Sequence, residues 1–264
     1  MPAPSTGRML RVGVQLHPQH CELADLRAAW RAVDALGADS LWTWDHFLPH
    51  HGDPDGPHLE CWSLLAAMAV ETEHATIGPL VSCTAFRNPH LLADMARTVD
   101  LLSGGRLILG LGAGWFEKEH RAYGYPFPSA GGRLDAFEKA VRAVRERLGA
   151  LNPPPAGRLP LLIGGGGEKR TLGLVARYAD LWNWYGWDAA DPVAEFRRRG
   201  ELLDGWCARV GRDPAAVERT VMIETSQLDL VADYAAAGAT HIVLSLPAPY
   251  DLEPVRRLIG LRDA

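Results

Sequence analysis

The sequence predicts a single (β/α)8 TIM barrel of the α/β class, with residues 1–264 forming one domain. A short β-type run, a loop rich in Gly, His or Trp, and a helical stretch follow one another eight times along the chain. The length of 264 residues is typical of such a barrel, which usually has about 250. Chemically informative side chains follow the expected strands, where barrel enzymes carry their active sites. An open doubly wound sheet is the second choice, and we expect residues 1–8 to be a poorly ordered tail.

The expected strands are short and rich in apolar and β-branched residues, as buried parallel strands are. They are Leu10–Leu16, Asp39–Trp44, Ala75–Val81, Arg106–Leu111, Leu159–Ile163, Asp180–Trp184, Thr220–Glu224 and Thr240–Leu246. In a closed barrel, the first of these strands lies beside the last.

The expected helices show apolar residues at spacings of three and four, together with recognisable ends. Gly37 ends the first helix, Pro89 begins the third, and Ser103–Gly105 ends the third. The helices are Leu23–Leu36, Glu60–Glu71, Asn88–Leu102, Leu134–Leu148, Lys169–Tyr178, Val193–Val210, Leu228–Ala237 and Leu252–Ile259.

Composition limits the possible partners. The net charge is −5, so no domain-wide positive field is present to hold a nucleic-acid backbone. The longest apolar runs fall far short of the ~18 residues that span a bilayer. The four cysteines include no C-x-x-C pair, which speaks against a zinc knuckle or a disulfide framework. We therefore expect a cytoplasmic protein with a small-molecule substrate and with neither nucleic acid nor membrane as a partner.

Two glycine-rich segments follow strands. Gly164–Gly167 lies directly between a strand and a helix, where backbone amides and the helix N-terminus together form an anion site. This run predicts a phosphate-binding loop; the alternative is a flexible turn that binds nothing. Gly110–Gly114 resembles a dinucleotide fingerprint, but Trp115 replaces its third glycine, so we reject a Rossmann site. Close approach of the strand end to a flat ligand or to the third loop explains these glycines better.

Asp45 and His46 end the second strand. A histidine there can act as a general acid or base near neutral pH, and an adjacent carboxylate could orient it. The alternative is a histidine that only bonds to its loop. Further histidines nearby raise a metal alternative, but no H-x-H pair ends the first strand and no carboxylate ends the eighth, so we predict no metal site.

Tryptophan is frequent, and six of the nine lie at or just beyond expected strand ends: Trp42, Trp44, Trp115, Trp182, Trp184 and Trp187. Aromatic side chains around a pocket mouth suit a large planar ligand. Packing between the barrel and its helices accounts for some of them.

Several motifs occur in the order and spacing of a known family. They are Asp39–Phe47, Phe86–Pro89, Leu102–Arg106, Gly114–Trp115 with Glu119, Gly164–Gly167 and Tyr178–Asn183. In these residues the chain resembles the luciferase-like monooxygenase superfamily. It is most similar to the branch of coenzyme F420-dependent oxidoreductases, as a short member.

The resemblance implies that a flavin or deazaflavin ring lies in the barrel mouth, against a bulge in the third strand with a non-proline cis peptide at Leu80–Val81. The implied cofactor-binding residues are Leu80, Val81, Ser82, Gly165, Gly166, Gly167, Glu168 and Asn183. His46 is the implied catalytic residue, with Asp45 beside it to hold its tautomer. We expect the substrate pocket to be lined by His17, Trp44, Trp115, Glu119, Trp184 and Tyr185.

The resemblance predicts an oxidoreductase that transfers a hydride between coenzyme F420 and a bulky, weakly polar organic substrate. One alternative is an FMN-dependent luciferase-like monooxygenase, which requires a separate flavin reductase. Another is a non-catalytic flavin- or deazaflavin-binding protein of the same fold. The family likeness also implies a homodimer.

Overall fold

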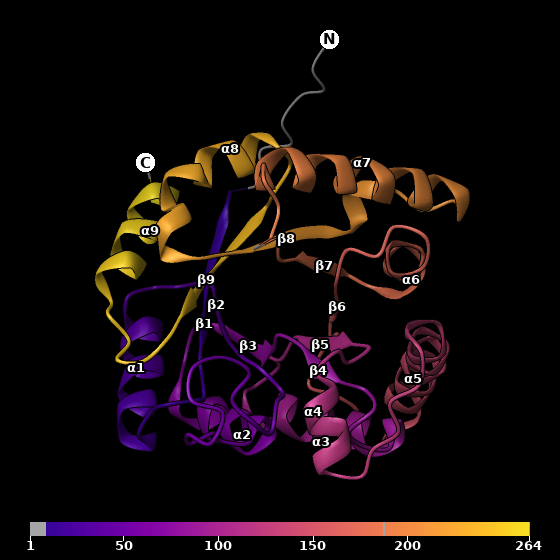
Figure 1. Ribbon diagram of the computed structural model, residues 1–264, viewed down its shortest axis with the longest axis horizontal. Coiled ribbons are helices and arrows are strands. Elements are labelled where there is room, and N and C mark those ends of the chain that lie inside the picture. The colour runs from indigo at the N-terminus through magenta and orange to yellow at the C-terminus, as the bar shows by residue number, and fades with distance from the viewer. Residues whose placement is uncertain (1–8, 187, 264) are drawn as a thin grey trace.

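The computed structural model describes residues 9–186 and 188–263; the expected tail at 1–8 and Trp187 lie outside them. The chain forms a barrel of parallel strands with its helices arranged as an outer layer (Figure 1). The strands are β1 (Arg11–Leu16), β2 (Ser40–Thr43), β3 (Thr76–Pro79), β4 (Ser82–Cys83), β5 (Leu109–Gly112), β6 (Leu161–Gly164), β7 (Leu181–Trp184), β8 (Glu218–Ile223) and β9 (His241–Leu246). Their order is β3-β2-β1-β9-β8-β7-β6-β5-β4.

The barrel closes where it was predicted to close. β1 pairs with β9 in parallel from Arg11↔His241 to Leu16↔Leu246. The predicted third strand consists of two pieces, β3 and β4, that share one neighbour. The Ile108 amide donates to the Ile77 carbonyl at 2.8 Å, while β4 pairs with β5. The eight predicted strands are therefore confirmed, with the third interrupted at Leu80–Val81, whose peptide bond is cis.

The helices and helical turns follow the predicted alternation. They are α1 (Leu23–Ala35), α2 (Cys61–Glu71), α3 (Pro89–Leu102), α4 (Glu117–Ala122), α5 (Ala130–Ala150), α6 (Thr171–Tyr178), α7 (Pro192–Arg209), η1 (Pro214–Ala216), η2 (Thr225–Leu230), α8 (Val231–Ala236) and α9 (Glu253–Asp263). Over residues 9–186 and 188–263, none of these helices has the length and apolar character that crossing a bilayer requires.

Three helical segments differ from the prediction. The short helix α4 lies in the long connection after β5, where the sequence pattern indicated only a loop. Helix α5 begins at Ala130, earlier than predicted, because the Ser129 side chain caps it by accepting from the Gly132 amide. The predicted helix Leu228–Ala237 is divided into the 3-10 turn η2 and the short α8.

The barrel interior is layered. Its middle is apolar and contains Trp42, Leu80, Ile108, Leu162, Leu181 and Val243. At the amino-terminal ends of the strands, Arg11 forms an ion pair with Glu218 at 3.0 Å. Polar interior side chains return at the carboxyl ends, where the loops meet. This end, which we call the mouth, carries the candidate site.

The glycines of β5 and β6 make room for Val81. A Cβ on Gly112 would lie 2.6 Å from Val81 Cγ2, and one on Gly164 would lie 3.0 Å from Val81 Cγ1. A Cβ on Gly110 would lie 2.1 Å from the Pro79 carbonyl oxygen. Of the two explanations offered for the glycines in this segment, close approach of the third loop is therefore the one that the structure supports.

Gly112→Ala should destabilise the protein by about 1–3 kcal/mol, because the stiff Val81 side chain must move. Adding Val81→Ala should make the double variant less destabilised than the sum of the two single variants. The same second change should not relieve Gly110→Ala, whose clash is with backbone. Denaturant unfolding measures each value. Gly149→Ala in helix α5 is the matched control, because no described atom lies within 4 Å of the added Cβ, and it should not destabilise the protein. If the effects of Gly112→Ala and Val81→Ala simply added, the packing argument would be contradicted.

Candidate active site

His46 lies at the mouth, directly after β2, and is mostly buried with 15% of its side chain exposed. Its Nδ1 is 2.8 Å from Oε2 of Glu119. Among the described residues, its Nε2 has no hydrogen-bond partner. The rings of His50 and Trp115 lie 4.9 and 5.7 Å from the His46 ring, centre to centre. His46 therefore presents one free ring nitrogen among aromatic neighbours.

Glu119 is fully buried and comes from helix α4. Its Oε1 accepts from the backbone amides of Phe47 and Leu48, at 2.5 and 3.0 Å. Burial alone would raise the pKa of Glu119, but the bonds from His46 and these two amides outweigh it and hold the pKa below its usual range. Glu119 is therefore a carboxylate at neutral pH. The prediction that it lines the substrate pocket is wrong, because it lies beneath His46.

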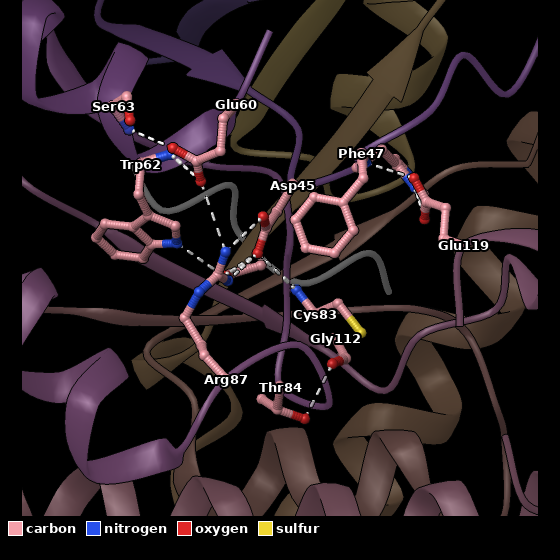
Figure 2. A network of polar contacts seen from close by, with 12 residues as sticks. Asp45, Phe47, Glu60, Trp62, Ser63, Cys83, Thr84, Arg87, Gly112 and Glu119 are labelled. Atoms are coloured by element: carbon pink, nitrogen blue, oxygen red, sulfur yellow. Dashed lines mark hydrogen bonds and ion pairs between the residues drawn. The ribbon is translucent and has the colours of Figure 1, made fainter. Parts of the chain in front are cut away.

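Asp45 forms a buried ion pair with Arg87 (Figure 2) and has no hydrogen bond to His46 among the described residues. Arg87 Nη2 donates to Asp45 Oδ1 at 3.1 Å, and Ser82 Oγ donates to Asp45 Oδ2 at 2.6 Å. Arg87 also lies 3.6 Å from Glu60, which caps helix α2. The prediction that Asp45 holds the tautomer of His46 is therefore wrong.

Ser82 belongs to the same buried network. Its Oγ accepts from Trp62 Nε1 at 3.1 Å and donates to Asp45, so the hydroxyl is fully engaged away from the mouth. The prediction that Ser82 binds the cofactor is therefore not supported by its position.

Trp44 lies at the centre of a histidine cluster. The rings of His17 and His50 lie 4.2 and 4.4 Å from the Trp44 ring, and Trp44 Nε1 donates to His58 Nε2 at 2.9 Å. His17 Nε2 is 2.8 Å from Ser245 Oγ. Burial lowers the pKa of His17 to about 3, of His50 to about 3 and of His58 to about 4. These three rings are neutral at neutral pH, so the cluster is aromatic and polar without being charged.

Three further predicted residues lie at the mouth. Trp115 is 61% exposed. Tyr185 donates to Glu224, and burial, reinforced by this partner, raises the Tyr185 pKa. Asn183 points into the barrel, and its buried Oδ1 has no partner within the described chain. Gln15 Oε1 is likewise buried without a partner, although Gln15 Nε2 donates to the Leu80 carbonyl at 2.7 Å.

The loop Gly164–Gly167 follows β6 and leads into α6. Gly165 has a φ of +116°, a conformation that favours glycine. Within the described part of the chain, the backbone amides of Gly166 and Gly167 have no backbone acceptor. A Cβ on Gly166 would lie 2.6 Å from Arg199 Nη1 and 2.8 Å from the Trp184 ring. Among the described residues, the loop therefore offers two amides without a backbone acceptor, next to an Arg199 guanidinium that pairs with Glu195.

Trp184 and Glu168 lie around this loop. Trp184 packs outside the barrel against Phe196, with ring centres 6.0 Å apart, so the prediction that it lines the substrate pocket is wrong. Successive residues of a strand point to opposite faces, and Asn183 takes the inward position. Glu168 is exposed and forms an ion pair with Arg198 at 2.5 Å. Its side chain faces solvent, while its backbone extends the glycine loop.

In residues 9–186 and 188–263, no three His, Cys, Asp or Glu side chains are grouped so that they could hold a metal ion.

The roles of Arg87 and Glu119 were missed by sequence reasoning. One signal for them was available: Asp45 and His46 are consecutive at a strand end, so their side chains point to opposite sides. Asp45 and His46 therefore need separate partners, and the buried Asp45 carboxylate requires a positively charged one from another segment of the chain.

Comparison with known proteins gives a family and a fold. A family model described as luciferase-like monooxygenase matches residues 8–237. An F420-dependent glucose-6-phosphate dehydrogenase from Amycolatopsis mediterranei is 33% identical over 140 residues, which is 52% of this chain and 41% of the relative. One from Intrasporangium calvum is 31% identical over 191 residues, 65% of this chain and 55% of the relative. The chain thus spans about half the length of these curated relatives.

A solved structure supports the architecture over the whole chain. An F420-dependent secondary alcohol dehydrogenase, in complex with an F420–acetone adduct, superposes with a TM-score of 0.83. The alignment covers 97% of this chain and 98% of the other, at 16% identity. At that identity, the likeness concerns the fold.

Arg87→Met should destabilise the protein by about 3–5 kcal/mol, because it leaves the buried Asp45 carboxylate without its counter-charge. Urea unfolding measures the loss. Arg121→Met is the control, since Arg121 forms an exposed pair with Glu117, and should cost less than about 1 kcal/mol. Adding Asp45→Asn to Arg87→Met should restore part of the stability. A loss from Arg87→Met no larger than the control's would show that the pair contributes little.

Proposed function

This chain belongs to the luciferase-like monooxygenase family, and we propose that it is a coenzyme F420-dependent oxidoreductase. It transfers a hydride between the deazaflavin and a bulky, weakly polar organic substrate. Two curated relatives named as F420-dependent dehydrogenases support the cofactor assignment. The observation that carries the proposal is the His46–Glu119 pair at the mouth, where His46 Nε2 has no hydrogen-bond partner among residues 9–186 and 188–263.

The mouth fits a phosphate-bearing cofactor with a flat, polar-edged ring. The backbone amides of Gly166 and Gly167, which have no backbone acceptor among the described residues, suit a phosphate. The half-buried Val81 forms a floor for a ring, because its side chain lies against glycines instead of larger residues. The buried Oδ1 of Asn183 and Oε1 of Gln15, which have no partner in the described part of the chain, are acceptors for polar groups on the ring edge.

When bound, the deazaflavin accepts or gives a hydride and reacts poorly with oxygen. The chain must then handle the accompanying proton. His46 Nε2 accepts the hydroxyl proton when an alcohol is oxidised, or donates a proton to the oxygen when a carbonyl is reduced. The rings of Trp44, His50 and Trp115 surround His46 and reduce the access of water to this transfer.

The substrate class is inferred from the lining of the mouth. Neutral imidazoles and indoles surround His46, since burial holds the pKa of His17, His50 and His58 far below neutral. Such surfaces favour aromatic or aliphatic groups with few charges. A weakly polar alcohol or carbonyl compound therefore suits this site better than a sugar phosphate.

Gly166→Asp should abolish cofactor binding, because a carboxylate would repel the phosphate at the loop. The Asn side chain of Gly166→Asn has nearly the same shape as Asp but no charge. Comparing the two variants therefore separates charge repulsion of the phosphate from the steric clash with Arg199 and Trp184. We expect Asp to weaken binding at least ten-fold more than Asn in titrations with F420 and with FMN. Equal binding by Asp and wild type would mean that the loop is only structural. Retention of FMN in preference to F420 would favour the monooxygenase alternative.

His46→Ala should lower turnover by ~10²–10⁴-fold, as expected for lost general acid–base catalysis. The F420 dissociation constant should stay within about two-fold, since the glycine loop is untouched. His90→Ala is the control, because His90 is exposed at the start of α3. Pre-steady-state hydride transfer with a panel of alcohols and ketones measures the effect. A His46→Ala rate equal to wild type would assign the proton transfer to another residue, and tight F420 binding without any turnover would favour a non-catalytic role.

A further inference from the structure

Helix α4 brings a buried carboxylate to the back of the His46 ring. Glu119 takes part in three hydrogen bonds: Oε2 bonds to His46 Nδ1 at 2.8 Å, and Oε1 accepts from the amides of Phe47 and Leu48. Both amides follow His46 directly in the chain. Glu119 therefore holds the ring and the backbone that carries it with one side chain.

This arrangement determines where the proton lies on neutral His46. A carboxylate can only accept hydrogen bonds, so the proton of the neutral ring must be on Nδ1. The lone pair is then on Nε2, which has no partner among the described residues. Because three donors maintain the ionised form of Glu119, the neutral His46 ring is held in this tautomer.

We propose that Glu119 is a positioning residue that fixes the Nδ1–H tautomer of His46 and so directs its Nε2 lone pair into the mouth. This inference rests on the proposed function, since it explains how His46 is prepared for proton transfer. Glu119 acts through His46 and does not itself contact the substrate. The carboxylate also stabilises the imidazolium that forms once Nε2 has taken a proton.

Glu119→Gln makes a sharp test because the amide has one accepting and one donating end. Its oxygen can still accept from the Phe47 and Leu48 amides, so the loop stays in place. Its NH2 group then faces Nδ1 of His46 and must donate to it. The variant should therefore move the ring proton from Nδ1 to Nε2, which removes the lone pair from the mouth.

The tautomer is read by nitrogen NMR on cofactor-free protein labelled with ¹⁵N-histidine, above neutral pH. The His46 signals are assigned from their loss in His46→Gln. We expect Nδ1–H in the wild type and Nε2–H in Glu119→Gln. Turnover with F420 should fall by about 10²–10⁴-fold, as for other bases held in the wrong tautomer, with KM changed less than about three-fold.

Glu117→Gln is the matched control. Glu117 lies on the same helix, and its partner is the exposed Arg121, so both the tautomer and turnover should match wild type. A Nδ1–H tautomer in Glu119→Gln would overturn the proposal, and so would an inverted tautomer with unchanged turnover. If the wild type shows no F420-dependent turnover, the proposed function fails, while the NMR result still decides whether Glu119 fixes the tautomer.

Discussion

The packing of Val81 against glycines is the constraint on which the barrel and its mouth depend. The third strand is interrupted, and its two pieces must both reach the neighbouring strand if the barrel is to close. Side chains at Gly110 and Gly112 would meet the Pro79 carbonyl and Val81 at distances no real Cβ tolerates. The same contact that permits closure also places Val81 at the floor of the mouth. Fold and site thus share one steric requirement.

Oppositely charged pairs lie at both ends of the barrel, while its middle is apolar. At the amino-terminal end, Arg11 pairs with Glu218. At the mouth, Arg87 compensates Asp45. Pairing of this kind adds little net stability compared with apolar packing, but breaking it is costly. The Asp45–Arg87 pair instead fixes the position of the backbone. It connects the segment after β2 to the β4 segment and so holds the chain that carries His46.

The alternation of strands and helices could be predicted from sequence because a hydrophobic period is a local property. The pairing of β1 with β9 followed from barrel closure and is confirmed. The position of Trp184 could not be taken from its place at a strand end, since inward and outward positions alternate there and Asn183 occupies the inward one. Helix α4 was missed because six residues carry too little periodicity to separate a helix from a loop. The Glu119–His46 contact spans 73 residues, and such a distance in sequence leaves no local pattern.

The partners of the mouth histidines divide them into two kinds. His17 bonds to the Ser245 hydroxyl and His58 accepts from the Trp44 indole; both partners are uncharged, and burial lowers both histidine pKa values. At a pH below the usual histidine pKa of about 6.5, these two histidines are protonated in the unfolded chain but remain neutral in the folded protein. The free energy of unfolding therefore falls as the pH drops from about 6.5 towards the lowered pKa values of His17 and His58. Above a pH of about 6.5, these two groups do not change the free energy of unfolding. His46 instead has a carboxylate behind it, so a proton taken up there meets a compensating charge. The mouth thus combines histidines that burial keeps neutral, His17 and His58, with His46, whose Nδ1 is bonded to a buried carboxylate.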